Sequence, residues 1–535
     1  MKKQTFKSIV SIISLTLVAS MFITGCGNNA PANGSNTSTG GNQSAGSGES
    51  TADKVMRVAV TSCPGNYNPY SSQAGGTYNI FGKTQVYDTL FCHDAEGNIV
   101  PSIVESYEMT PDNLTITMKL HQGVKFSNGD PFTSADAKYS LDLCKATTTM
   151  AVYFECIDSI EAPDEYTIVL NLNTPNAALF ENLTLYGQMV CKKAHEELGD
   201  DYGMTMETTI GTGPYVITEF TPELSVSYKA NEDYFKGAPS VKKVEVQTIV
   251  NDDSALISLQ TGEFDYFMNS APAIAIDNIK SNSNLELVNI VSKKMYYMCL
   301  NCESGPFADP NMRRAVALAI NRDDLNVMGT EGLGTVVYYP GYPTNTGNPD
   351  INSEVAYHQD QEEARRLIKE AGYEGATITI SMENNSIIQL FATALQSQLE
   401  AVGLKVQVEM MEHNAFMDDV FSQGNYEMTM SFSTARTGDM DFVWTNTMSS
   451  AKVGSGNTAR YVNPEMDALL KKAREEMDPE ARKEAYADCI KLYLQDLPLL
   501  PITYEYSSRV YNKDNLSIDE GLIEQDNFYY FKWNN

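Results

Sequence analysis

The sequence has 535 residues, of which 42% are hydrophobic, and its formal net charge is −31. A chain of this length is expected to form more than one domain and has enough apolar residues for large cores. A surface this acidic repels nucleic acid and anionic lipid, and the sequence has no basic stripe that would offset the negative charge. We therefore exclude nucleic-acid binding.

The first 25 residues have the plan of a secretory signal peptide. A lysine-rich start precedes an apolar run over residues 9–23, which is short for a membrane span. Residues 23–26, Ile-Thr-Gly-Cys, resemble a bacterial lipobox, which implies diacylation of Cys26; the alternative is an ordinary signal with a chance cysteine. The segment that follows, up to residue 54, is rich in Gly, Ser, Asn and Thr and is expected to be a flexible tether. We therefore expect a lipoprotein that is held at the membrane by its lipid anchor only.

Eight cysteines remain after Cys26, and most lie in apolar segments, which is typical of small buried hydrophobic residues. In an exported protein some of them could form disulfides, but the spacing does not give a connectivity. Cys299 and Cys302 match C-x-x-C. They continue an apolar strand, on which positions i and i+3 face opposite sides, and no second C-x-x-C follows, so we favour core residues over a zinc or redox site.

The folded part is expected to begin near Val55, with an alternating strand. A second alternating strand is predicted over residues 114–120. After a Ser-Asn-Gly-Asp turn, Thr133 is expected to cap a helix, with Asp136 completing a capping box. Further along, Asp309 is a predicted N-cap, with a proline at the first helical position. Helices that alternate with apolar strands indicate an α/β architecture.

The order of these strand, turn and helix motifs resembles the order found in the family 5 extracellular solute-binding proteins. These are the dipeptide-, oligopeptide- and nickel-binding receptors of ABC importers. The resemblance is carried by residues 100–142, with their Gly-Val-Lys-Phe step and Asn-Gly-Asp-Pro turn, and by Gly-Thr-Gly-Pro-Tyr at residues 211–215. It implies a two-lobed periplasmic-binding-protein fold with a hinge, of the Venus flytrap type (type II, cluster C). We expect lobe I to comprise residues 55–295 plus 503–535, and lobe II residues 296–502.

Motifs for catalysis are missing from the sequence. There is no G-x-S-x-G, and His195-Glu196 begins an H-E-x-x-H pattern whose second histidine position holds Gly199. The five histidines do not pair at metal-ligand spacing. His413 would matter in a nickel- or haem-binding relative, but a surface role is the simpler interpretation. We therefore predict no enzyme activity, no metal and no cofactor.

The candidate ligand-binding residues lie in the stretch 431–444. In the dipeptide-binding members of the family, the Asp of a Thr-Gly-Asp loop in the second lobe pairs with the ligand's ammonium group, and residues 437–439 match that loop. The sequence then departs from the family pattern, so either Asp439 or Asp441 could take this role. An acid that only caps its own backbone is the alternative.

Three further residues of this stretch are candidates for ligand contact. Arg436 could bind a ligand carboxylate bidentately or restrain the acid. Phe442 and Trp444 could form an aromatic wall, although use in the core is equally compatible with the sequence.

The predicted function is that of an extracytoplasmic lipoprotein that captures a small solute, a di- or oligopeptide, and delivers it to the permease and ATPase subunits of an ABC transporter. We expect the receptor to be a monomer. An oligosaccharide receptor of the same fold is the alternative within the binding class, and a secreted lipoprotein hydrolase is the alternative from another class.

Overall fold

The computed structural model describes residues 54–70, 77–342, 344–434 and 437–534. The signal peptide, Cys26 and the tether predicted from the sequence lie outside these residues. Within the part that is described, no helix combines the length and the apolar character needed to span a membrane.

The described residues pack around two main hydrophobic cores. One core is built from residues 56–268 together with residues 511–531, and the other from residues 295–504. We call the parts of the chain around them lobe I and lobe II. The exact lobe boundaries stay a prediction.

Lobe I contains short strands and helices. They are β1 Val55–Val60, α1 Thr77–Val86, β2 Phe91–His93, β3 Ile99–Pro101, β4 Val104–Met109, β5 Thr115–Leu120, α2 Ser134–Ala146, β6 Ile157–Asp164, β7 Thr167–Leu172, α3 Ala178–Leu185, α4 Lys192–Leu198, β8 Tyr215–Thr221, β9 Ser225–Ala230, β10 Lys243–Thr248, α5 Asp252–Gln260, β11 Tyr266–Phe267, α6 Ala273–Ser281, β18 Leu516–Ser517 and β19 Lys532–Trp533.

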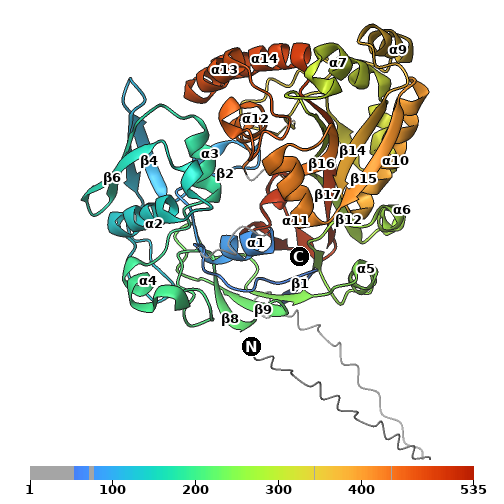
Figure 1. Ribbon diagram of the computed structural model, residues 1–535. Helices are drawn as coiled ribbons and strands as arrows, with labels where there is room; N and C mark the ends of the chain where they lie inside the picture. The colour runs from blue at the N-terminus through green and yellow to red at the C-terminus, as the bar shows by residue number, and fades with distance from the viewer. Residues whose placement is uncertain (1–53, 71–76, 343, 435–436, 535) are drawn as a thin grey trace, which may run out of the picture. The chain divides into compact units, whose positions relative to one another are not determined.

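Lobe II is richer in helix. Its elements are α7 Pro310–Ala319, α8 Arg322–Thr330, β13 Gly334–Val336, α9 Gln361–Glu370, β14 Thr377–Glu383, α10 Ser386–Ala401, β15 Lys405–Met411, α11 His413–Phe416, β16 Met428–Thr434, α12 Met440–Met448, α13 Pro464–Glu475 and α14 Pro479–Asp496. Helices α13 and α14 run side by side, as Figure 1 shows.

The local predictions of the opening strands and helices are confirmed. Strands β1 and β5 form where the apolar residues alternate. The capping box at the start of α2 is present, with the Asp136 side chain accepting from the Thr133 backbone N–H at 2.9 Å. Asp309 caps α7 by accepting the backbone N–H of Asn311 at 2.8 Å. These elements follow from signals a few residues apart, which is why the sequence reveals them.

Two long antiparallel strands, β12 Leu285–Leu300 and β17 Leu499–Asn512, run through the main sheet, whose order is β15-β14-β16-β12-β17-β11-β1-β10-β9-β8, with β13 added beside β17. The pairing of β12 with β17 has an irregularity between the Val291–Tyr506 and Met295–Tyr504 pairs. A separate sheet, of order β4-β5-β7-β6, belongs to lobe I.

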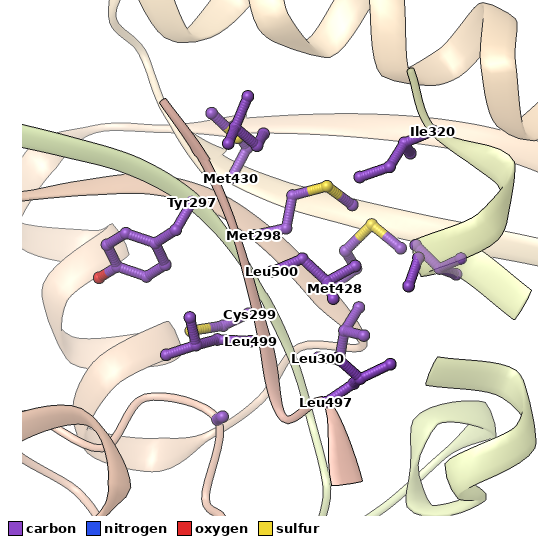
Figure 2. Packing of buried hydrophobic residues seen from close by; sticks show 14 of the residues in the cluster. Tyr297, Met298, Cys299, Leu300, Ile320, Met428, Met430, Leu497, Leu499 and Leu500 are labelled. Carbon is purple, nitrogen blue, oxygen red and sulfur yellow. The ribbon is translucent and has the colours of Figure 1, made fainter. Parts of the chain in front are cut away.

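Strand β12 is buried on both faces where it enters lobe II. Figure 2 shows Tyr297 and Cys299 on one side of the strand and Met298 and Leu300 on the other, and all four are at most 3% exposed. A strand that is covered on both faces reads as a continuous apolar run, as this one does. Cys299 is therefore a core residue, while Cys302 lies beyond the end of the strand.

Candidate functional site

The loop that leads into helix α12 is the centre of the candidate site, since it carries the predicted ligand-binding acids. Thr437 and Asp439 are buried. The loop is fixed to a neighbouring segment by two backbone hydrogen bonds: Thr346 N–H donates to the Gly438 carbonyl oxygen at 2.8 Å, and Met440 N–H donates to the Thr346 carbonyl oxygen at 3.1 Å. These two hydrogen bonds hold the loop that carries Asp439 and leads to Asp441.

Asp439 forms a buried bidentate ion pair with Arg482 of helix α14. The two guanidinium nitrogens donate to the two carboxylate oxygens at 2.7 Å each, and the exposed fractions of the Arg482 and Asp439 side chains are 4% and 1%. One of these oxygens also accepts the Asp441 N–H at 2.7 Å, so Asp439 is the N-cap of α12. Burial raises the pKa of Asp439, and the adjacent Arg482 guanidinium opposes that rise.

The backbone-capping role that the sequence left open for Asp439 is therefore present in the structure. Both carboxylate oxygens already have a cationic partner. Whether Asp439 also contacts a ligand stays a prediction.

Asp441 pairs with a second arginine, Arg474 of helix α13. The Arg474 Nε lies 3.0 and 3.1 Å from the two Asp441 oxygens, and Thr445 donates its hydroxyl to Asp441 at 2.8 Å. This pair is more open than the first, with side-chain exposed fractions of 29% for Arg474 and 14% for Asp441. Of the two predicted acids, Asp441 is the one nearer to solvent.

The two predicted aromatic residues lie on α12 but have different surroundings. Trp444 is fully buried in lobe II, where its ring faces Tyr486 and Tyr493 at centroid distances of 6.4 and 5.9 Å. Phe442 is only half-buried and packs against both main cores. Its ring lies 6.0 Å from that of Tyr153 in lobe I, so Phe442 stands where the lobes meet.

Two hydrogen bonds join the same region to lobe I. Gly438 N–H donates to Oε1 of Glu181 on α3 at 3.0 Å. Ala177 N–H, just before α3, donates to the Arg474 carbonyl oxygen at 3.0 Å. The Glu181 side chain is 2% exposed, and its other oxygen lies 3.0 Å from Nε2 of His93. We call the Glu181–Gly438 contact the inter-lobe bond.

A side chain at position 438 would not fit this arrangement, because a Cβ added to Gly438 would lie 2.6 Å from Glu181 Oε1. The glycine is needed here for close approach. Sequence analysis did not single out Glu181, Arg474 or Arg482, and no short-range signal marks them, because each meets its partner only after folding. Arg436, the remaining predicted residue of this stretch, lies outside the described residues.

His195 and His413 each lie beside one polar side chain. Nδ1 of His195 lies 2.9 Å from the Tyr139 hydroxyl, and desolvation lowers the pKa of His195. Nδ1 of His413 lies 2.9 Å from Glu383. Across residues 54–534, apart from the undescribed gaps, no three His, Cys, Asp or Glu side chains gather closely enough to hold a metal ion.

The eight cysteines from Cys63 to Cys489 are free thiols. Burial raises the pKa of Cys144 and of Cys489 to about 12. Buried thiols with raised pKa values are poor nucleophiles and behave as packing residues.

Two cores joined by two long strands, with polar contacts where they meet, define a two-lobed protein. Residues 98–455 match the family model of the bacterial extracellular solute-binding proteins, family 5. The glutathione-binding protein GsiB of Pectobacterium atrosepticum is 30% identical over 473 residues, which cover 85% of this chain and 89% of that protein.

Solved structures agree on the fold. HbpA2 from Haemophilus parasuis matches with a TM-score of 0.80 at 21% identity, over 90% of this chain and 100% of that chain. DppA from Helicobacter pylori, solved with the peptide STSA, matches with a TM-score of 0.72 at 23% identity, over 90% of this chain and 98% of that chain.

The chain therefore belongs to family 5 of the bacterial extracellular solute-binding proteins. Its fold is the two-lobed α/β fold of the periplasmic binding proteins, and its role is that of a substrate-binding protein.

Proposed function

We propose that the protein captures a short peptide with a free amino terminus, of the glutathione class, between its two lobes and delivers it to an ABC permease. The observation that carries this proposal is the match to a glutathione-binding protein across 85% of the chain, which includes both lobes. DppA from Helicobacter pylori was solved with a peptide, which agrees with a peptide-like ligand. The charged side chains at the lobe contact suit a ligand with ionic ends.

Within the site, we propose that Asp441 meets the ligand's ammonium group and that Asp439 supports the loop. Asp441 has the larger exposed fraction, 14% against 1%, and its partner Arg474 also contacts lobe I through its backbone. Phe442 would supply an apolar contact beside the ligand. Trp444 would act indirectly, by packing behind helix α12, and Arg436 stays a candidate for a ligand carboxylate.

We propose that the hinge lies in β12 and β17 at the pairing irregularity near Val291, Met295 and Tyr504. These strands connect the two cores, and a break in regular pairing is where a small dihedral change costs little. The lobe contacts are made in this structure, so opening at this point would separate them and admit the solute.

The remaining proposals concern the cellular setting. Cys26 would carry a diacyl anchor, and the protein would act as a monomer on the outer face of a membrane, with no catalytic activity. A diacyl group buries many CH₂ groups at about 0.8 kcal/mol each, which suffices for stable anchoring. If a Cys26→Ser variant stayed in the membrane fraction as the unchanged protein does, the anchor would be refuted.

Calorimetric titration tests the ligand class. We expect glutathione or a dipeptide to bind, and the N-acetylated forms to bind at least tenfold more weakly, because a charge-assisted hydrogen bond is worth roughly 1.5–3 kcal/mol. Asp441→Asn should reduce the affinity for the free peptide but change that for the acetylated peptide little. Asp324→Asn, at an exposed position of lobe II, is the control and should change neither.

Three results would contradict the proposal. Equal affinity for free and acetylated peptides would remove the amino-terminus interpretation. Binding of cellobiose in preference to every peptide would favour the oligosaccharide receptor, and turnover of either ligand would favour the hydrolase.

A further inference from the structure

The pairing irregularity between β12 and β17 is a bulge in β12. Residues 292–294 of β12 lie opposite the single residue Glu505 of β17, because the regular pairs resume on either side of them. A bulge interrupts the ladder of hydrogen bonds and lets the strand bend locally. It occupies the position that we propose for the hinge, so the side chains that span it bear on how the lobes move.

The ammonium group of Lys294, the last residue of the bulge, is held by groups from three neighbouring strands, which run side by side in the order β16, β12, β17 (Figure 1). Its Nζ lies 3.3 Å from Oε2 of Glu505 on β17. It also lies over two aromatic rings, 4.7 Å from the ring centroid of Tyr296 on β12 and 4.8 Å from that of Phe432 on β16. A cation over the face of a ring is attracted by it. We call these four side chains the Lys294 cluster.

The Lys294 cluster is anchored in the fold. Tyr296 is 1% exposed, and its ring centroid lies 4.9 Å from that of Phe391 on α10. The Tyr296 hydroxyl lies 3.4 Å from the Glu505 oxygen that Lys294 also contacts. The side chains of Lys294 and Glu505 are only 27% and 33% exposed, so salt screens this ion pair less than a fully exposed one.

The cluster lies where both connecting strands leave lobe II. Lys294 directly precedes Met295, the first core residue of lobe II, and Glu505 directly follows Tyr504, the last one. Strand β16, which carries Phe432, pairs with this part of β12 and precedes the loop that leads into helix α12. A bend at the bulge therefore changes the separation of Lys294 and Glu505.

We propose that Lys294 is a positioning residue for ligand binding, which holds the connecting strands in the arrangement that keeps the lobes in contact. This inference rests on the proposed function and hinge. The Lys294–Glu505 ion pair and the inter-lobe bond are both present in this structure. Opening at the bulge draws Glu505 away from Lys294, so the cluster stabilises the closed arrangement. Without the cluster a smaller fraction of molecules is closed, and the apparent ligand affinity falls in proportion.

Hydrogen exchange of the unliganded protein tests the proposal without any ligand. Lys294→Met keeps the apolar stem and removes the cation. We expect the Gly438 amide, which donates across the lobes to Glu181, to exchange about fivefold faster in this variant. Lys294→Arg keeps a cation that stacks on aromatic rings and should restore most of the protection. Mass spectrometry of the fragment that contains Gly438 measures the exchange.

Lys513→Met is the matched control, since it breaks another ion pair between the same two strands. Lys513 directly follows β17, and its Nζ lies 2.9 Å from Glu286 of β12, with side-chain exposed fractions of 42% and 37%. This pair lies at the lobe I end of the strands, away from the bulge. The control should therefore leave the exchange of Gly438 and the ligand affinity unchanged.

Calorimetric titration with glutathione or a dipeptide gives the second measurement, and Lys294→Met should bind about fivefold more weakly than the unchanged protein. Equal exchange of Gly438 in Lys294→Met and Lys513→Met would overturn the proposal. So would an unchanged affinity of Lys294→Met for a peptide that the unchanged protein binds. If no peptide binds the unchanged protein, the proposed function fails, and the exchange measurement alone decides whether Lys294 controls the lobe contact. Circular dichroism confirms that each variant is folded.

Discussion

Replacing Arg482 by Met is expected to lower the free energy of unfolding by about 3–5 kcal/mol, because it strands the Asp439 carboxylate in the interior without its partner. Both oxygens of Asp439 bind this arginine at 2.7 Å, and its side chain is 1% exposed. The carboxylate must then remain ionised in an apolar environment or take up a proton. Urea unfolding followed by circular dichroism measures the loss.

Arg474→Met is the matched control, because it breaks the more open ion pair with Asp441. We expect it to lower the free energy of unfolding by about 1 kcal/mol or less. The double variant Asp439→Asn/Arg482→Met removes both buried charges and should recover part of the stability. If Arg482→Met cost no more than Arg474→Met, the Asp439–Arg482 pair would not be the support of the site that we infer.

The inter-lobe bond gives the second prediction. Gly438→Ala should weaken ligand binding at least tenfold, because the new Cβ would lie 2.6 Å from Glu181 Oε1, and the Glu181 carboxylate would have to move away and give up the inter-lobe bond. Glu181→Ala removes the acceptor of the Gly438 N–H and should also weaken binding. The Gly438→Ala/Glu181→Ala double variant has no Glu181 carboxylate for the new Cβ to meet. Its loss of binding free energy should therefore be smaller than the sum of the losses in the two single variants.

Calorimetric titration with glutathione or a dipeptide, whichever binds more tightly, measures the ligand affinity of the unchanged protein, of the two single variants and of the double variant. Gly65→Ala is the control, because a Cβ there meets only the Glu223 side chain at ordinary van der Waals distances. Strict additivity of the two single losses would show that the contact plays no part in closure.

The elements that could be predicted from the sequence are those with local signals. The paired helices α13 and α14 each begin with a proline after a capping Asn or Asp, which is a local signal that the sequence shows directly. For strand β12, the sequence predicts only the apolar end that contains Cys299. Its earlier part, residues 285–291, mixes apolar residues with Glu286 and Asn289, and it pairs with β17, more than two hundred residues later.

The candidate site could be predicted only in part, for the same reason. The loop with Asp439 and Asp441 was found by its resemblance to a family motif. Their partners Arg482 and Arg474 lie on helices far along the chain, and Glu181 meets Gly438 across 257 residues. Such pairs depend on tertiary packing, which periodicity and capping motifs do not encode.

Small-angle scattering during ligand titration tests the central claim most directly, because a receptor of this class acts by closing its two lobes on a solute. With glutathione or a dipeptide at calorimetrically proven saturation, the radius of gyration should decrease. The melting temperature should rise as well, since a hundredfold excess over the dissociation constant adds about 2.7 kcal/mol of stability. A radius of gyration that stays unchanged at proven saturation would contradict the account of a hinged, peptide-capturing receptor.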